Sequence, residues 1–149
     1  MNGLVKKMRR LIVIYDICSI VVTPFPFTDR KAAKRRPALI VSEPEYQAHT
    51  GHATMLMITS AKHSKWHGDW EIKNLEIAGL PVPSIVRQKV FTLDLRLVIK
   101  QIGYLATEDQ WHISKIFNSH YKSLLDRALS QSNFTIHEPV ANYESSKNS

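Results

Sequence analysis

The sequence predicts one small, mainly β domain, a barrel or a curled antiparallel sheet, with an amphipathic helix added at its C-terminal end. Short stretches rich in β-branched residues, separated by turn residues, recur through residues 11–105. The hydrophobic spacing changes to that of a helix only after residue 106. Strands and helices do not alternate, which argues against a parallel α/β fold. The length of 149 residues suits a single domain.

The expected strands differ in how clearly the sequence marks them. Residues 11–27 are rich in β-branched side chains, and Pro24 and Pro26 make the end of this strand irregular or edge-like. Short apolar runs predict two buried strands, at residues 38–42 and 53–58. Three further strands are expected at residues 70–77, 84–91 and 97–105. The connections at residues 28–36, 43–51, 61–69 and 79–84 are polar or rich in turn residues.

The last element is predicted as a helix over residues 108–130. Thr107 and Gln110 have the spacing of a capping box. Apolar residues from Trp111 to Leu129 follow at helical spacing. We therefore expect a single domain over residues 11–130, a loose basic extension over residues 1–10, and a disordered polar tail over residues 131–149.

Composition and charge narrow the possible functions. The chain carries 20 Lys and Arg against 13 Asp and Glu, a net charge of +7, so nucleic acids and acidic proteins are natural partners. We find no stretch long enough to span a membrane, and the apolar run after the basic N-terminus is too short for a secretory signal, so we expect a cytoplasmic protein. Cys18 is the only cysteine, which excludes an internal disulfide and favours a buried thiol.

The motifs of common enzyme classes are missing from the sequence. There is no Gly-rich phosphate loop and no CxxC, HExxH or GxSxG motif. His63 and His67 are four residues apart, but they lie in a polar loop without an obvious third ligand. We therefore expect neither a metal site nor a cofactor.

Two groups of residues could bind a phosphate group. The loop before residue 37 carries five cations: Arg30, Lys31, Lys34, Arg35 and Arg36. A solvated hairpin tip is the ordinary explanation for such a run of charge. Arg36 differs from the other cations because it immediately precedes Pro37 and a buried strand, so its backbone is fixed. A fixed arginine can direct its planar guanidinium group at a phosphate and form two hydrogen bonds to it. Thr59 and Ser60 end another buried strand, where their hydroxyls can donate to phosphate oxygens or cap the next turn.

These segments resemble the PemK/MazF family of toxins. The similarity begins with Val22–Asp29, continues through Lys34–Ser42 and Ile58–Ser60, and extends in order through residues 78–87, 92–94 and 102–103. It covers about residues 17–125. One departure is Cys18-Ser19, where family members usually carry Gly-Asp at the start of the first strand.

The resemblance implies a fold, an activity and partners. The fold is an SH3-like barrel with an added helix, which forms a two-fold dimer, and the members are mostly sequence-specific endoribonucleases that use no metal. The catalytic Arg before Pro corresponds to Arg36, and the catalytic Thr corresponds to Thr59, with Ser60 beside it. Family toxins are encoded with small antitoxins, so an acidic antitoxin is the expected partner besides RNA and a second copy of the chain.

The chemistry expected at this site is transesterification by the RNA 2′-hydroxyl. Arg36 would stabilise the phosphorane, and Thr59 would hydrogen-bond a non-bridging oxygen. Arginine is a poor general base because it stays protonated, so His63 is a candidate proton carrier. Lys34, Arg35 and Lys62 would hold backbone phosphates.

Three other functions fit the same fold. The chain could be a nucleic-acid-binding module that does not cleave, a toxin directed at DNA gyrase, or an interaction domain without a nucleic-acid role. The pairing of Arg36-Pro37 with Thr59-Ser60 favours RNA cleavage over these three.

Overall fold

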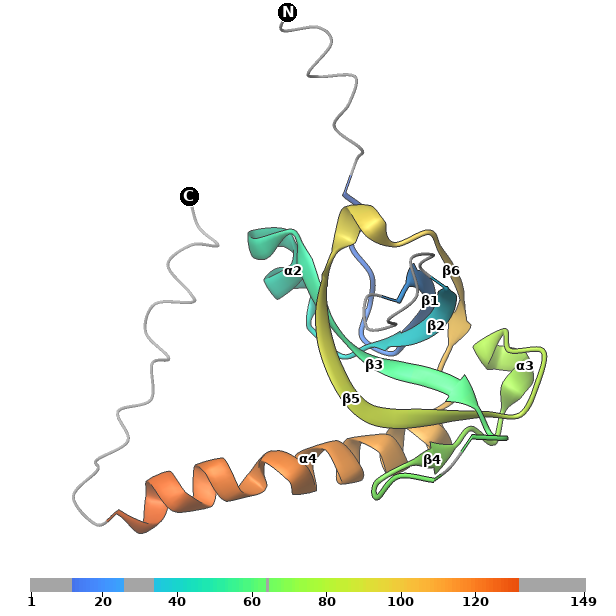
Figure 1. The fold of residues 1–149 in the computed structure, drawn as a ribbon. Coiled ribbons are helices and arrows are strands. Elements are labelled where there is room, and N and C mark those ends of the chain that lie inside the picture. The colour runs from blue at the N-terminus through green and yellow to red at the C-terminus, as the bar shows by residue number, and fades with distance from the viewer. Residues whose placement is uncertain (1–11, 26–33, 64, 132–149) are drawn as a thin grey trace, which may run out of the picture. The chain divides into compact units, whose positions relative to one another are not determined.

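A computed structural model describes residues 12–25, 34–63 and 65–131 (Figure 1). The chain divides into two compact units, residues 1–117 and 118–149, and the sheet lies in the first. The basic extension expected at residues 1–10 lies outside the described residues, as does the expected polar tail beyond Gln131.

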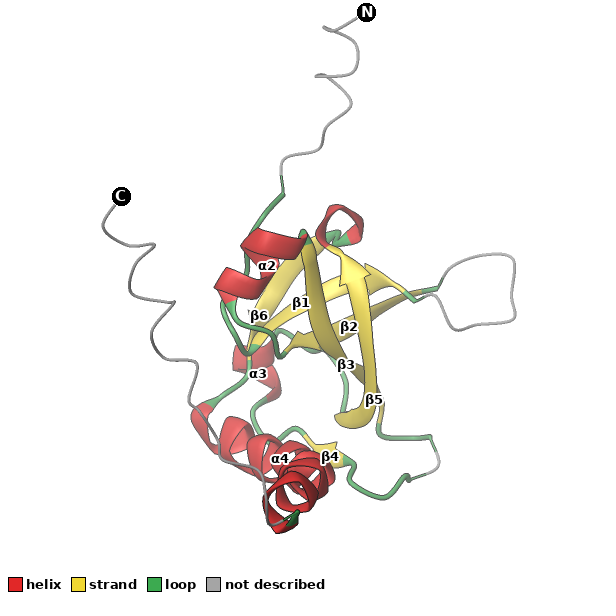
Figure 2. Cartoon of the chain, turned by 90° about the vertical axis from the view of Figure 1, so that its left-hand side faces the viewer, coloured by secondary structure: helices red, strands yellow, loops and turns green. Residues whose placement is uncertain are grey.

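The core of the first unit is one six-stranded antiparallel sheet that curls strongly (Figure 2). Its strand order is β4-β5-β3-β2-β1-β6. The strands are β1 Ser19–Pro24, β2 Arg35–Ile40, β3 His52–Ser60, β4 Trp70–Glu71, β5 Ser84–Asp94 and β6 Lys100–Tyr104. The predicted mainly β fold with an added helix is therefore confirmed.

An irregularity in the pairing of β3 with β5 accompanies this curl. Leu56 pairs with Val90, whereas the next residue, Met57, pairs with Arg87. Gln88 and Lys89 are therefore extra residues on β5, and we call them the β5 bulge. Bulges of this kind bend a strand and increase its twist.

Both faces of the central strands are buried, which explains their continuous apolar sequence. Ala38, Ile40, Met55 and Met57 belong to a cluster that also contains Phe25 and Phe91, called the inner cluster below. The alternate residues of the same strands face a second cluster with Val86 and Ile113, called the outer cluster: Leu39, Leu56, Ile58. The start of the last helix thus covers the face of the sheet opposite the inner cluster.

The predicted turn at residues 43–51 is wrong, because this segment forms helix α2, Pro44–Thr50. Pro44 starts the helix, where its missing N–H is not needed, and Gly51 ends it in the left-handed conformation at φ 68°. The helix buries Gln47, whose amide bonds the backbone N–H and C=O of Tyr15 at 2.9 and 2.8 Å. A polar residue therefore faces inward, and hydrophobic spacing cannot reveal such a helix.

The first strand, predicted over residues 11–27, is also shorter in the structure, where β1 spans only Ser19–Pro24. Residues 12–18 are not in a strand, since Tyr15 bonds a side chain of α2 and not a neighbouring strand. Cys18 then turns the chain into β1 with φ 70°, in the left-handed region that favours glycine. This turn sits where family members usually carry Gly, and it forms here with Cys.

Two later predictions also need correction. Only Trp70–Glu71 of the expected strand 70–77 is a strand, and Leu75–Ala78 forms helix α3. β5 extends to Asp94, a 3-10 turn covers Leu95–Leu97, and β6 begins at Lys100. Helix α3 packs closely on β6, because a Cβ on Gly79 would strike the backbone of Ile102 and one on Gly103 would strike Ala78 (Figure 1).

The last helix, α4, spans Thr107–Ser130, as predicted. The predicted capping box is wrong in its use of Gln110, whose side-chain amide donates to the carbonyl of Leu105 at 2.6 Å. Ile113 is buried, whereas Leu124, Leu125 and Leu129 are exposed in the single chain. None of the described helices combines the length and apolar character needed to cross a membrane.

Candidate active site

Arg36 and Thr59 meet on the inner-cluster face of the sheet. Arg36 Nη1 donates to Thr59 Oγ1 at 3.4 Å, and the two residues would face each other if the β2–β3 register continued two residues beyond the Ala38–Met57 pair. On its other side, Arg36 pairs with Thr23 of β1. Thr59 and Thr23 are buried and Arg36 is half-buried. The two residues singled out in the sequence as catalytic candidates are therefore in contact, although they are 23 residues apart.

Two cations share one aromatic ring beside this pair. The guanidinium of Arg36 lies 5.7 Å from the ring centre of Phe25, and the ammonium of Lys89 lies 5.6 Å from it. Phe91 packs edge-on against Phe25 at 5.6 Å. The negative face of an aromatic ring attracts cations, so Phe25 helps to hold both positive charges at the same ring. The sequence analysis did not identify Phe25 or Lys89.

The arrangement leaves hydrogen-bonding capacity unused. Arg36 Nε and Thr23 Oγ1 are buried, and neither has a hydrogen-bond partner among the described residues. A buried polar atom without a partner costs about 1–3 kcal/mol. Arg36 Nε is thus a donor prepared for an acceptor that the described chain does not supply.

The remaining predicted binding residues lie around this pair. Lys34 and Arg35 are exposed at the start of β2, and Arg35 pairs with Pro24. Ser60 Oγ accepts from the backbone N–H of Lys62 at 3.3 Å, so Ser60 acts as a turn cap. Lys62 and His63 are exposed in the loop that follows β3. Arg30 and Lys31 lie outside the described residues.

A buried ion pair fixes the loop after β3, and the sequence analysis missed it. Arg87 of β5 binds Asp69 through two N–O contacts, Nε–Oδ1 at 3.1 Å and Nη2–Oδ2 at 2.8 Å. Both side chains are only 7% exposed. The ring of Trp66 covers the guanidinium at 4.6 Å, and the Trp66 backbone N–H donates to Asp69 at 2.8 Å. We call Trp66, Asp69 and Arg87 the loop clasp.

The electrostatics of the loop clasp favour the charged carboxylate. Burial alone would raise the pKa of Asp69, but hydrogen bonds from Arg87 and from the Trp66 backbone, together with the Arg87 charge, hold that pKa below its usual value. Arg87 belongs to a segment similar to the family, but its partner, Asp69, lies 18 residues away in a loop.

A second buried carboxylate fixes the chain beyond β4. Asp109, in the first turn of α4, accepts from the Trp70 indole at 2.9 Å and from the backbone N–H groups of Lys73 and Asn74 at 2.9 and 3.1 Å. Trp70 also stacks on His112 with ring centres 3.9 Å apart. The segment between β3 and α3 is thus fastened near its middle by Asp69 and near its end by Asp109.

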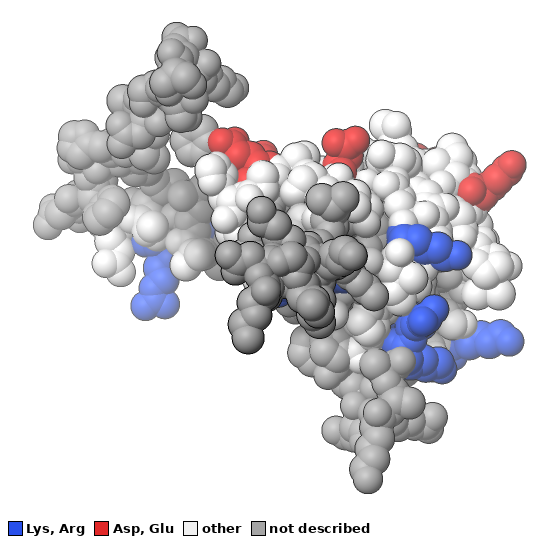
Figure 3. Space-filling view, turned by 90° about the horizontal axis from the view of Figure 1, so that it is seen from above, with Lys and Arg blue, Asp and Glu red and all other residues white. Residues whose placement is uncertain are grey.

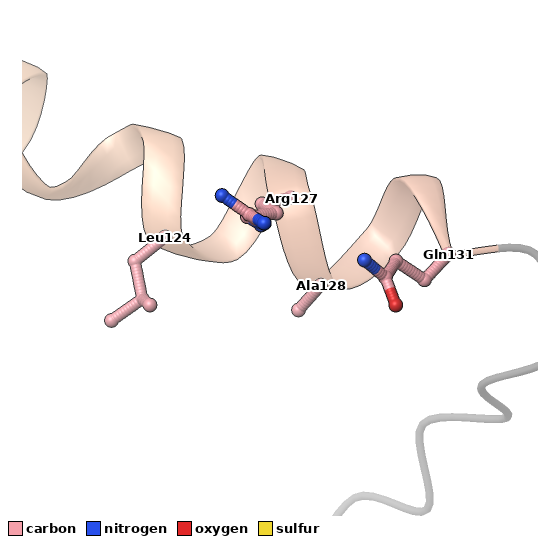
Figure 4. Close-up of a pocket in the computed structure, with 4 residues that line it drawn as sticks. All are labelled: Leu124, Arg127, Ala128 and Gln131. Carbon is pink, nitrogen blue, oxygen red and sulfur yellow. The ribbon is translucent and has the colours of Figure 1, made fainter.

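Other surfaces of the described chain show fewer features of a catalytic or binding site. Within the described ranges, no three His, Cys, Asp or Glu side chains gather as metal ligands, and His63 and His67 are both exposed. In the second unit, a hollow is lined by Leu124, Arg127 and Ala128 of α4 and by Gln131, which follows the helix (Figure 4). Seen from above, most visible Lys and Arg side chains lie on one side of the described surface, with Asp and Glu along the opposite edge (Figure 3).

Comparison with known proteins decides the family. The family described as the PemK-like, MazF-like toxin of type II toxin-antitoxin systems matches residues 17–120. The chain belongs to this family. The predicted resemblance is therefore confirmed over most of the chain, including the strands that carry Arg36, Thr59 and Arg87.

Solved structures of PemK/MazF toxins share the fold. MazF from Deinococcus radiodurans superposes with a TM-score of 0.60 at 19% identity, covering 74% of this chain and 98% of that one. Mycobacterium tuberculosis toxin MazF-mt6 gives 0.56 at 21% identity, covering 70% and 96%. A mycobacterial endoribonuclease in complex with its cognate antitoxin gives 0.58 at 13% identity, covering 72% and 95%. No curated protein matches the chain significantly in sequence.

Proposed function

We propose that this toxin-family chain is an endoribonuclease that cleaves single-stranded RNA in the cytoplasm, without a metal ion, by attack of a 2′-hydroxyl on the adjacent phosphate. The observation that carries the proposal is the contact between Arg36 and Thr59, together with the buried Arg36 Nε that has no hydrogen-bond partner in the described part of the chain. PemK/MazF toxins are generally endoribonucleases, and this pair occupies the positions expected for their catalytic Arg and Thr.

The hydrogen bond between Arg36 and Thr59 supports the role we propose for each residue. A guanidinium can only donate, so Thr59 Oγ1 must be the acceptor in this bond, and its own proton is left for another acceptor. A non-bridging phosphate oxygen meets that requirement. Arg36 Nε can donate to the same phosphate, and Lys89 adds a second positive charge nearby. The negative charge of the phosphorane is thus met by side chains of the protein.

The reaction then balances without an external nucleophile. The 2′-oxygen forms a bond to phosphorus and the bond from phosphorus to the 5′-oxygen breaks. A base takes the proton of the 2′-hydroxyl, and an acid gives a proton to the leaving 5′-oxygen, so no proton is gained or lost overall. The products are a 2′,3′-cyclic phosphate and a 5′-hydroxyl. His63 is our candidate for proton transfer, because a guanidinium group is a poor base and His63 lies exposed just after β3.

We also propose an acidic antitoxin and a homodimer as partners. A mycobacterial neighbour was solved with its cognate antitoxin, and a net charge of +7 attracts an acidic peptide. Such a peptide would compete with RNA for Arg36 and the exposed Lys34, Arg35 and Lys62.

The decisive experiment is incubation of the chain with a long RNA in EDTA, followed by mapping of the cut ends. We expect cyclic phosphate and 5′-hydroxyl ends, and resistance where the cut site carries 2′-deoxyribose. Cleavage that stops in EDTA and returns with magnesium would contradict the proposal. Binding without cleavage would favour the non-cleaving module, and growth arrest without RNA damage would favour a protein target such as gyrase.

A further inference from the structure

Trp66 is held by three contacts and remains half exposed. Its ring lies against the Arg87 guanidinium at 4.6 Å, its N–H donates to Asp69, and its carbonyl accepts from the Asp69 N–H at 3.2 Å. Even so, 49% of the residue is exposed. A rigid aromatic side chain loses little conformational entropy when it binds a partner, so Trp66 is prepared for contact with a flat ligand.

The position of Trp66 relates it to Arg36 and Thr59. Arg87, which Trp66 covers, pairs with Met57, and Met57 precedes Thr59 by two residues on the same face of β3. If the β2–β3 register is continued to Arg36 and ordinary strand spacing is used, the Arg36 and Arg87 backbones would be about 12 Å apart along a flat sheet, and the curl of the sheet brings them no farther apart. A single strand of RNA crosses such a distance within a few nucleotides.

The surroundings of Trp66 suit a single-stranded nucleic acid. Lys62 and Lys65 are exposed in the same loop, and Lys89 lies on the inner-cluster face beside Phe25. Proteins that bind single strands combine cations for the backbone with aromatic side chains on which bases stack. Duplex RNA keeps its bases stacked inside and cannot use such a ring.

Trp111 provides a contrast within the same unit. It is 56% exposed and also carries a cation, Lys115, at 4.3 Å. However, it lies in the first turns of α4, whose Ile113 and Phe117 pack on the outer-cluster face, opposite the face that bears Arg36. Exposure and a stacked cation are therefore common to both tryptophans, whereas only Trp66 shares a face with the candidate active site.

We propose that Trp66 is a stacking platform for an unpaired base of the substrate RNA, a few nucleotides from the scissile phosphate. This inference rests on the proposed function in taking RNA as the substrate. Stacking tolerates any base, so Trp66 selects single strands over duplexes and leaves base identity to other contacts.

The test is an affinity measurement that does not depend on cleavage. The probe is a labelled, mixed-sequence single strand of roughly 16 nucleotides with 2′-fluoro riboses, which cannot undergo 2′-hydroxyl attack. Trp66→Leu keeps an apolar cover over Arg87 but lacks a π face, and Trp66→Phe restores one. We expect Trp66→Leu to raise the Kd roughly tenfold to a hundredfold, with most of the loss recovered in Trp66→Phe. The salt dependence should stay unchanged, because no cation is removed.

The matched control is Trp111→Leu, which should bind the strand as the unmodified protein does. Equal affinity of Trp66→Leu and Trp111→Leu would overturn the inference, as would failure of the unmodified protein to prefer the single strand over a duplex. If the unmodified protein binds the probe through Trp66 but leaves natural RNA intact, the proposed cleavage fails and the stacking platform stands. If it cleaves RNA and Trp66→Leu has no effect on affinity, the platform fails and the cleavage stands.

Discussion

The Asp69–Arg87 pair allows a stability prediction to be worked out from its geometry. Its two N–O contacts are 3.1 and 2.8 Å long and both side chains are 7% exposed. Asp69→Asn keeps the size of the side chain but leaves the Arg87 charge buried without its counter-ion. Breaking a buried pair in this way costs about 3–5 kcal/mol. We expect a loss of that size in the free energy of unfolding, measured by urea titration.

A surface ion pair supplies the matched control. Arg96 binds Asp94 at 2.6 Å, but its side chain is 59% exposed. Asp94→Asn should lose much less stability than Asp69→Asn, because water screens the pair and Asn remains a good cap for the 3-10 turn. Replacing both partners of the buried pair, as Asp69→Asn with Arg87→Met, should recover part of the loss. Equal losses in Asp69→Asn and Asp94→Asn would refute the reasoning.

The same pair predicts a pH dependence with a definite sign. Because the pKa of Asp69 is lower in the folded protein than in the unfolded chain, its contribution is complete above about pH 4 and is lost as the pH falls through the folded-state value. The stability difference between the unmodified protein and Asp69→Asn should therefore shrink in acid. Urea titrations at a series of pH values measure it, and a constant difference would contradict the assigned charge state.

The remaining predictions concern the site and the backbone. Arg36→Ala should slow RNA cleavage by about a hundredfold or more in a timed assay, and Arg36→Lys should also be slow because it lacks the fork. Thr59→Val should fold and bind RNA but turn over slowly; full activity would remove Thr59 from the mechanism. Cys18→Gly should be more stable than Cys18→Ala by about 1 kcal/mol in urea, the reverse of the usual order, since φ is 70°. Gly103→Ala should cost at least about 2 kcal/mol, because the new Cβ meets the backbone of Ala78.

The strands and the helix whose apolar residues match their buried positions could be predicted from the sequence. Residues 38–40 and 55–58 are apolar throughout because both faces of β2 and β3 are buried, and α4 shows helical spacing over several turns. Helix α2 could not be found in this way, since its buried residue is Gln47 and the bonds that hold Gln47 come from Tyr15. Pro44 and Gly51 mark the two ends of this helix in the sequence, but the polar composition of residues 43–51 predicted a turn instead.

The residues of the candidate site also differ in whether the sequence could predict them. Arg36 and Thr59 were found because each adjoins a buried strand in a segment similar to the family. The loop clasp was not found, because Asp69 and Trp66 lie in a polar loop and acquire their roles only through contact with β5. Lys89 looked like an ordinary strand residue, and only the bulge in β5 explains its position beside Phe25.

The β5 bulge has a consequence for how such a site could arise or be lost in evolution. Removing Gln88 and Lys89 together would leave Leu56 opposite Val90 and Met57 opposite Arg87, so every other pair between β3 and β5 would keep its register. A single two-codon insertion or deletion could therefore switch one of the two cations on Phe25 while the core remained intact. Length variation at this point in the strand is thus a route by which relatives could gain or lose affinity for a phosphate without refolding.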